Sequence, residues 1–198
     1  PMADKLITAE ICVHFLHFDS SHYPSHGNRI KCNPAIKTPA DRAALLQALK
    51  DGRLDIIATD HAPHTAEEKD ATDYRKAPSG LPLVQDALLS VLELHHDGDL
   101  GLEQIVRLTA HNVADRFKVV DRGYLREGYW ADLVLVDTET PTPATADRVL
   151  SQCGWTPFEG ETFRSSIART IVNGQTVFDG EAIVEAGAAQ RLEIGRQR

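Results

Sequence analysis

The sequence predicts an α/β protein, with strands and helices alternating in its first part and a small antiparallel sheet near its end. Apolar and β-branched runs at 6–13 and 54–59 flank a helical pattern at 38–51. This order of strand, helix and strand is typical of a βαβ unit with parallel strands. Residues 170–178 place Asn-Gly between two β-branched runs, which indicates a hairpin.

The helix between the two predicted strands has a clear beginning and end. Thr38 can cap the first turn, Pro39 fits the first helical position, and Asp41 places a negative charge near the helix N-terminus. Leu and Ala residues then recur at helical spacing and form one apolar stripe. Asp51-Gly52 is expected to end the helix.

The chain divides into three regions, at 1–120, 121–180 and 181–198. The first carries the alternating pattern, the second the strands of the small sheet, and the third is a polar tail. The other expected elements are a short strand at 29–33, helices at 81–95, 102–108 and 112–117, and a strand at 133–137. A stretch rich in Pro and Thr, 138–161, is expected to be irregular.

Composition excludes several classes of protein. Lys and Arg number 21 against 29 Asp and Glu, a net charge of −8, so no excess of cations is present to neutralise nucleic-acid phosphates. No apolar run reaches the roughly 20 residues that span a bilayer, and the first five residues lack the apolar core of a secretory signal. Cys12, Cys32 and Cys153 are widely spread, which suits a reducing compartment. We expect a cytoplasmic protein that binds neither nucleic acid nor membranes.

The stretch richest in chemistry is TDHAPHT at 59–65, directly after a predicted buried strand. In α/β barrels, polar residues at the C-terminal ends of strands form the active site. Asp60 is the first polar side chain that could point into such a mouth, where a carboxylate can ligate a divalent metal, accept a proton, or both. The simpler interpretation is that Asp60 caps the next helix and that His61 and His64 are loop histidines.

This stretch resembles the signature of the dihydroorotases, which are cyclic amidohydrolases of pyrimidine biosynthesis. The signature covers DHAPHT at 60–65 and Glu-Glu-Lys at 67–69, and the second histidine, His64, is usually absent from hydantoinase-like relatives. Residues 77–81 look like the family's loop that closes over substrate. The similarity extends to KCNPAIK at 31–37 and, less specifically, to the amidohydrolase tail strands at 128–137 and 169–177.

The resemblance implies roles for five residues. Asp60 matches the metal-ligating aspartate that also serves as general base. Asn33, His64 and the backbone around Pro78 and Gly80 match positions that hold dihydroorotate or carbamoyl-aspartate. The implied reaction is reversible hydrolysis of the cyclic amide of dihydroorotate to N-carbamoyl-aspartate. The implied cofactor is zinc, as one or two ions, which lowers the pKa of bound water to about 7 and polarises the carbonyl.

Weaker matches surround this set. Glu10 matches a glutamate near the metal site of some members. The segment VHFL at 13–16 resembles the family's Pro-His-His-Leu, but two of its four positions differ, which favours a structural role for His14. The charged residues at 67–70, Lys69 among them, are most simply a solvated loop face.

The family's His-x-His pair and the arginine after it do not occur in these 198 residues. A (β/α)8 barrel needs about 250 residues. The resemblance therefore implies the C-terminal part of a TIM-type barrel at 1–120 and part of a small antiparallel β-domain at 121–180. With Asp60 as the one expected ligand and the others upstream, we expect weak metal affinity and negligible turnover from the isolated chain.

Partners and alternatives follow from the same reasoning. We expect a small-molecule substrate and either a homo-oligomer or completion by an N-terminal half. Two other functions stay open: a hydantoinase-like or allantoinase-like cyclic amidohydrolase, and a non-catalytic dihydroorotase-like scaffold protein.

Overall fold

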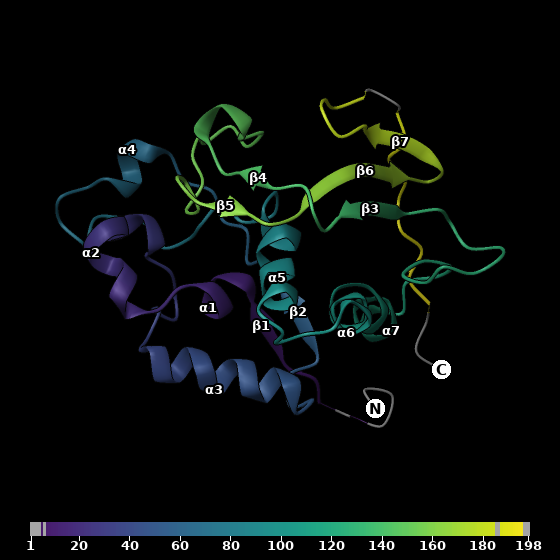
Figure 1. The fold of residues 1–198 in the computed structure, drawn as a ribbon, viewed down its shortest axis with the longest axis horizontal. Helices are drawn as coiled ribbons and strands as arrows, with labels where there is room; N and C mark the ends of the chain where they lie inside the picture. The colour runs from purple at the N-terminus through teal and green to yellow at the C-terminus, as the bar shows by residue number, and fades with distance from the viewer. Residues whose placement is uncertain (1–4, 6, 185–186, 196–198) are drawn as a thin grey trace.

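The computed structural model describes Lys5, residues 7–184 and residues 187–195. Its centre is a parallel pair of strands, β1 (Glu10–Cys12) and β2 (Ile56–Ala58), with Cys12 opposite Ala58 (Figure 1). The helix α3 (Pro39–Lys50) completes the crossover between them, as the strand–helix–strand pattern predicts. Both strands are shorter than expected. Val13 already begins a helix, and Leu6 lies outside the described residues.

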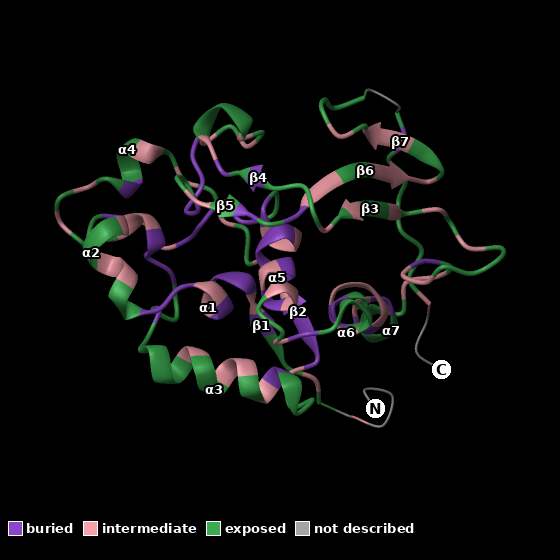
Figure 2. Cartoon of the chain, viewed as in Figure 1, coloured by how far each residue is buried: buried purple, intermediate pink, exposed green. Residues whose placement is uncertain are grey.

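The helix α3 begins as its sequence predicts. Thr38 Oγ1 accepts a hydrogen bond from the Asp41 amide (3.3 Å), and the Asp41 carboxylate accepts one from the Thr38 amide (3.0 Å). Pro39 occupies the first turn, and Gly52 follows the helix with φ = 72°. Figure 2 shows that most of α3 is exposed or half-buried, with Leu49 in the core.

Short helical turns fill the connection between β1 and α3. They are α1 (Val13–His17), η2 (Ser20–His22), α2 (Tyr23–His26) and η3 (Gly27–Ile30). The strand expected at 29–33 does not form. The Lys31 amide instead donates back to the Asn28 carbonyl (2.9 Å), and the Lys31 carbonyl accepts from the Gly80 amide (3.0 Å). Its backbone bonds therefore join a turn and a loop, not a sheet.

Helices dominate the region after β2: α4 (Ala66–Lys69), α5 (Ala87–His96), α6 (Leu102–Val106), the π-helical turn η4 (Arg107–His111) and α7 (Asn112–Phe117). The helix α5 begins later than predicted because Leu81 forms a parallel bridge with His61 and the segment after it stays extended. The helices α6 and α7 are joined through η4, so the two expected helices follow one another without a break.

The C-terminal sheet is antiparallel, as the sequence predicts. Its strands β3 (Leu133–Asp137), β6 (Ser166–Val172) and β7 (Gln175–Phe178) lie in the order β3-β6-β7. The turn between β6 and β7 has Asn173 and Gly174 at φ = 50° and 80°, which suits the right-handed twist of a hairpin.

The stretch expected to be irregular is mostly turns. It also contains the start of a short pair, β4 (Thr142–Pro143) with β5 (Thr162–Phe163), and the turn η5 (Ala146–Arg148). Residues 185–186 and 196–198 of the predicted tail lie outside the described residues.

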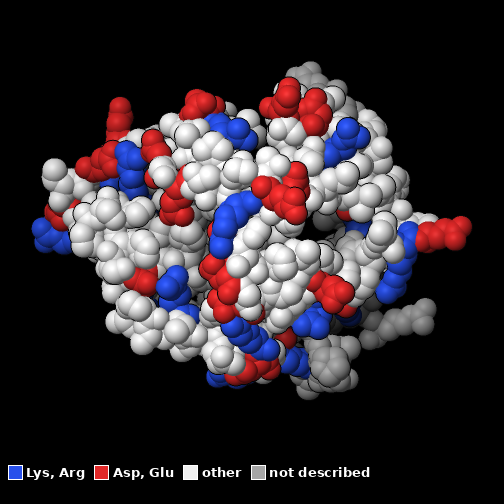
Figure 3. Space-filling model, in the orientation of Figure 1, with Lys and Arg blue, Asp and Glu red and all other residues white. Residues whose placement is uncertain are grey.

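One hydrophobic core joins these parts. Buried residues of β1, α1 and α5 pack with aromatic side chains from the segment before β5, and the rings of Phe18 and Phe158 stack at 5.4 Å. Figure 3 shows acidic and basic side chains interspersed over one face of the molecule. None of the described helices combines the length and apolar character needed to cross a membrane.

Candidate active site

Asp60 lies two residues beyond the last residue of β2. Its backbone is left-handed, with φ = 49°, a conformation that is uncommon for residues other than glycine and that gathers at functional sites. The side chain is exposed, and no hydrogen bond or ion pair to its carboxylate is found within the described residues. The sharp turn therefore presents an exposed carboxylate just beyond the carboxyl end of the strand.

His14 occupies the matching place beyond β1. Because Cys12 and Ala58 are paired, the residues two positions further on, His14 and Asp60, leave the same edge of the parallel pair. The His14 side chain is fully buried, and neither ring nitrogen has a partner within the described part of the chain. Burial lowers the pKa of this imidazole to about 4, while the charge of Asp60 acts in the opposite direction. The ring is therefore neutral near pH 7.

This environment argues against the structural role expected for His14. A histidine kept only for packing would have its polar atoms satisfied, because unpaired buried polar groups are costly. A neutral imidazole with a free lone pair is instead the form that ligates metals. Together His14 and Asp60 offer the nitrogen and oxygen donors that zinc accepts, so both residues fit a metal site. Within residues 5, 7–184 and 187–195, no three His, Cys, Asp or Glu side chains form a complete one.

His61 has a structural place next to Asp60. Its Nδ1 accepts hydrogen bonds from the amides of Leu83 (3.0 Å) and Val84 (3.1 Å). The Ala62 amide donates to the Leu81 carbonyl (2.9 Å). These bonds fix the DHAPH segment against the chain that leads to α5.

His64 points at residues 77–81, the loop that the family resemblance predicts to close over the substrate. Its Nε2 donates to the Ser79 carbonyl (3.2 Å), and its Nδ1 lies 3.8 Å from a Glu68 oxygen. The indole of Trp155 donates to the His64 carbonyl (2.8 Å), which holds the segment from the other side. The half-buried imidazole is thus already oriented by the protein.

Gly80 fits its place only because it lacks a side chain. A Cβ atom there would lie 2.6 Å from the Ala62 carbonyl oxygen, and the backbone has φ = 140°. The Gly80 amide donates to the Lys31 carbonyl (3.0 Å), so this N–H is not free for a ligand. The carbonyls of Pro78 and Gly80 also have protein partners, described below. These two residues therefore form a wall whose polar backbone atoms face the protein.

The structure brings two of the five predicted residues close together, because a Cβ on Gly80 would lie 3.2 Å from the His64 ring. Pro78 is next to Ser79, whose carbonyl His64 binds, and Asn33 lies exposed two residues beyond Lys31. Within the described residues, no hydrogen bond joins Asp60 to this group. Asp60 is linked to these residues only by its position in the sequence, two residues before Ala62.

Lys69 is the clearest residue that the sequence interpretation missed. It was expected on a solvated loop face, but its side chain is fully buried and bound to three carbonyls. The Thr-x-x-Glu spacing at 65–68 forms a capping box that starts α4. That signal could have indicated a helical turn with Lys69 on the face opposite the exposed Glu67.

The thiols near the site are not nucleophiles. Burial is the main cause that raises the pKa of Cys12 and of Cys32 to about 11, and the negative charge of Asp60 adds to it in both cases. Both sulfurs therefore stay protonated near neutral pH, as buried packing cysteines do.

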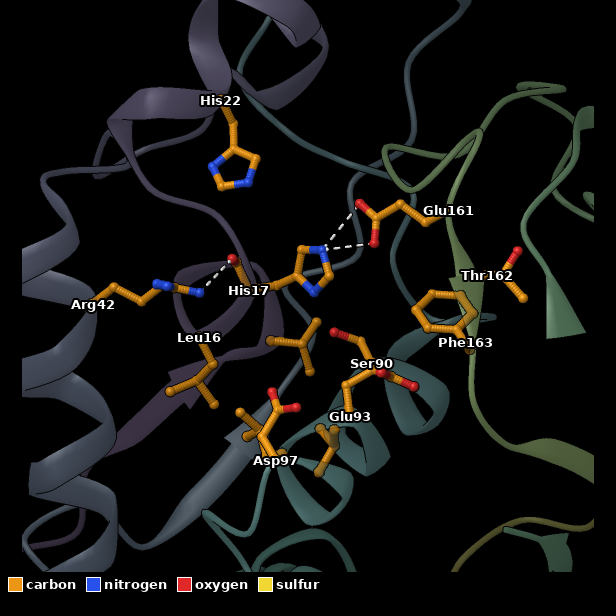
Figure 4. Close-up of a pocket in the computed structure, with 13 residues that line it drawn as sticks. Leu16, His17, His22, Arg42, Ser90, Glu93, Asp97, Glu161, Thr162 and Phe163 are labelled. Atoms are coloured by element: carbon orange, nitrogen blue, oxygen red, sulfur yellow. Dashed lines mark hydrogen bonds and ion pairs between the residues drawn. The ribbon is translucent and has the colours of Figure 1, made fainter. Parts of the chain in front are cut away.

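A pocket of about 330 Å³ lies away from these residues, between α1, α5 and β5 (Figure 4). Its charged groups are already paired: His17 with Glu161 (3.1 Å), and Glu93 and Asp97 each with Arg164 (2.6 Å). None of the predicted site residues lines it. We therefore place the candidate site at the strand ends.

Comparison with known proteins defines the class. Residues 4–177 match the Amidohydrolase family, and the chain belongs to that family. The relatives then narrow the resemblance. A dihydroorotase of Halobacterium salinarum is 41% identical over 176 residues, which are 89% of this chain and 41% of that protein. A dihydroorotase of Clostridium acetobutylicum is 38% identical over 77% of this chain and 36% of its own length.

Solved structures confirm the mixed α/β amidohydrolase fold. The L-hydantoinase of Arthrobacter aurescens superposes with a TM-score of 0.86 at 26% identity, covering 93% of this chain and 42% of its own. A dihydropyrimidinase from Brevibacillus agri gives a TM-score of 0.80 at 23% identity, covering 89% of this chain and 40% of its own. The chain thus spans about two fifths of the length of the relatives it matches.

Proposed function

We propose that the chain is the C-terminal part of a dihydroorotase, which reversibly hydrolyses the cyclic amide of dihydroorotate to N-carbamoyl-aspartate. The observation that carries the proposal is the pair at the strand ends, a free Asp60 carboxylate beside a buried His14 imidazole without a partner. The curated dihydroorotases at 41% and 38% identity support this substrate over other cyclic amides.

Asp60 and His14 would hold the metal, with further ligands from residues outside these 198. When bound, a divalent cation, expected to be one or two zinc ions, lowers the pKa of water and polarises the substrate carbonyl. Asp60 then accepts a proton from the attacking water. It returns that proton to the ring nitrogen as the carbon–nitrogen bond breaks.

Asn33 and His64 would hold the substrate. Dihydroorotate and carbamoyl-aspartate are anions, and the net charge of −8 works against binding them. Local hydrogen-bond donors must compensate. The exposed Asn33 amide offers two N–H donors, and His64 stands beside the Pro78–Gly80 wall.

The remaining organisation is part of the same proposal. Residues 1–120 form the C-terminal portion of the barrel, 121–180 contribute to the small β-domain, and 181–198 form the tail. The protein acts in the cytoplasm, and either a homo-oligomer or an N-terminal half completes the site.

A hydantoinase-like activity is the second candidate, because the L-hydantoinase of A. aurescens superposes with a TM-score of 0.86. His64 and the Asn33-Pro34 pair favour dihydroorotase. A substrate panel with the full-length protein separates the two. We expect ring opening of dihydroorotate and little of hydantoin or allantoin. Opening of hydantoin or allantoin without dihydroorotate would overturn the choice. A parent protein that lacks an upstream His-x-His and opens no ring would indicate a scaffold.

A further inference from the structure

The ammonium group of Lys69 is buried in an unusual way. Its three N–H bonds are matched by three backbone carbonyls, those of Lys31 (3.0 Å), Pro78 (3.0 Å) and Gly80 (2.8 Å). Within the described residues, no carboxylate pairs with it. Three acceptors saturate the donors of an ammonium, so the charge is held by oriented backbone dipoles alone.

These carbonyls belong to two segments that are distant in sequence. One is residues 31–33, which we call the Asn33 arm, and the other is the loop at 73–81, which includes Pro78 and Gly80. A second lysine strengthens the same junction, because the Lys31 ammonium donates to the carbonyls of Tyr74 (2.6 Å) and Ala77 (2.5 Å). Each lysine thus connects the arm to the loop.

The junction also reaches the DHAPH segment. Gly80 packs against Ala62 so closely that a Cβ would not fit, and His64 donates to the Ser79 carbonyl. Two of the three segments that carry the proposed substrate-binding residues therefore bind one ammonium group, and the third packs against the loop that this ammonium holds.

Burying this charge is costly, and packing does not require it. An unpaired cation loses its hydration in the interior, and burial lowers the pKa of Lys69 to about 8. A methionine would fill the same space without that cost. What the ammonium supplies, and an apolar side chain cannot, is a fixed direction for three carbonyls.

We propose that Lys69 is a positioning residue that fixes the Asn33 arm and the Pro78–Gly80 loop against the DHAPH segment. The loop is then a preformed wall of the site and not a lid that closes over the substrate. This inference rests on the proposed function for the identity of the ligand, but the bracing of the loop can be tested without it.

The test uses the full-length protein with Lys69→Met and, as a matched control, Lys76→Met at an exposed lysine of the same loop. Hydrogen exchange of peptides covering 73–81 is measured without ligand. We expect Lys69→Met to speed exchange there by about tenfold or more, and the control to match wild type. Unchanged hydrogen exchange in Lys69→Met would show that Lys69 does not fix the loop, whatever the substrate proves to be.

Steady-state kinetics then separate positioning from mere stability. For Lys69→Met we expect KM for dihydroorotate to rise about tenfold or more while kcat changes by less than about threefold, because the reacting groups are left in place. A lower melting temperature with unchanged KM would mean a purely structural role and would overturn the proposal. Absence of dihydroorotate turnover in wild type would instead defeat the proposed function, and the exchange result would still decide the brace.

Should Lys69→Met fail to fold, wild type provides the decision. A preformed wall is protected before ligand is added, and its exchange changes by less than about twofold on saturation with dihydroorotate. Protection of 73–81 that arises only with ligand would identify a lid and overturn the proposal.

Discussion

Asp60 and His14 reach the same edge of the parallel pair by different routes. A left-handed backbone at φ = 49° turns the Asp60 carboxylate out of the strand into the open. The start of α1 carries the His14 imidazole into the interior, where its nitrogens find no partner among the described residues. One group is therefore exposed and the other buried, and the proposed metal site rests on this carboxylate and this imidazole.

Replacing Asp60 in the full-length protein gives the first prediction. Asp60→Asn removes the proposed proton acceptor with little change in shape, so we expect kcat to fall by about 10²–10⁴-fold. Steady-state assays of dihydroorotate hydrolysis check this. Glu67→Gln serves as the control, because Glu67 is an exposed carboxylate nearby, and it should retain wild-type kcat.

His14→Gln is expected to act on the metal. The amide keeps some of the volume but is a poor ligand for zinc. Bound metal after dialysis, measured by elemental analysis, should fall well below that of wild type. Full metal content in His14→Gln would show that the imidazole is a packing residue.

Lys69 gives a prediction about pH. Its pKa is about 8 in the folded protein against 10.5 for an ordinary lysine. Between these values the unfolded chain binds one more proton than the folded chain, so stability contributed by this residue rises with pH. The difference in unfolding free energy between wild type and Lys69→Met should therefore shift in favour of wild type, by on the order of 1–3 kcal/mol, from pH 8 to pH 10. Urea unfolding at both pH values measures it, and a shift in the other direction would contradict the buried ammonium.

Among the elements, those with local signals follow the sequence and those shaped by distant contacts do not. The Thr38 and Asp41 cap begins α3 where predicted, and Asn173-Gly174 makes the hairpin, because each signal acts within a few residues. The strand expected at 29–33 fails because the Lys31 amide bonds to a local turn and its carbonyl accepts from a loop some 50 residues away. No pattern within that segment encodes such a partner.

The candidate site divides in the same way. Asp60, His64 and Gly80 could be chosen from the sequence because they stand in a recognisable motif. The burial of Lys69 could not, since the three carbonyls it binds are created by folding. For His14 the sequence favoured a structural role, because two neighbouring positions differ from the family pattern. The unpartnered burial of its ring, on which the proposed metal role rests, is created by folding.

The close contact between Gly80 and Ala62 gives a prediction about stability. Gly80→Ala should destabilise the protein more than Gly52→Ala, although both glycines have positive φ. The added Cβ meets Ala62 at 2.6 Å in the first case and open space in the second. We expect about 2–4 kcal/mol against about 1 kcal/mol. Chemical denaturation of both variants checks this, and equal losses would mean that the loops are not packed as described.

Over the whole molecule, one core joins the parallel pair, the helices and the segment before β5. That continuity makes these residues a folded unit. This unit nevertheless supplies only two of the proposed metal ligands, Asp60 and His14. The relatives that the chain matches are more than twice as long. We therefore expect the isolated 198-residue chain to bind metal weakly and to turn over dihydroorotate negligibly. Substantial dihydroorotase activity from the purified chain alone would contradict this division of the site.

The strand-end site is tested most directly by locating the metal. Crystals of the full-length protein loaded with zinc would be measured at the zinc absorption edge. We expect an anomalous peak within about 2.0–2.2 Å of an Asp60 carboxylate oxygen and a His14 ring nitrogen. A zinc ion bound elsewhere, with His14 hydrogen-bonded to protein and Asp60 in a salt bridge, would contradict the assignment.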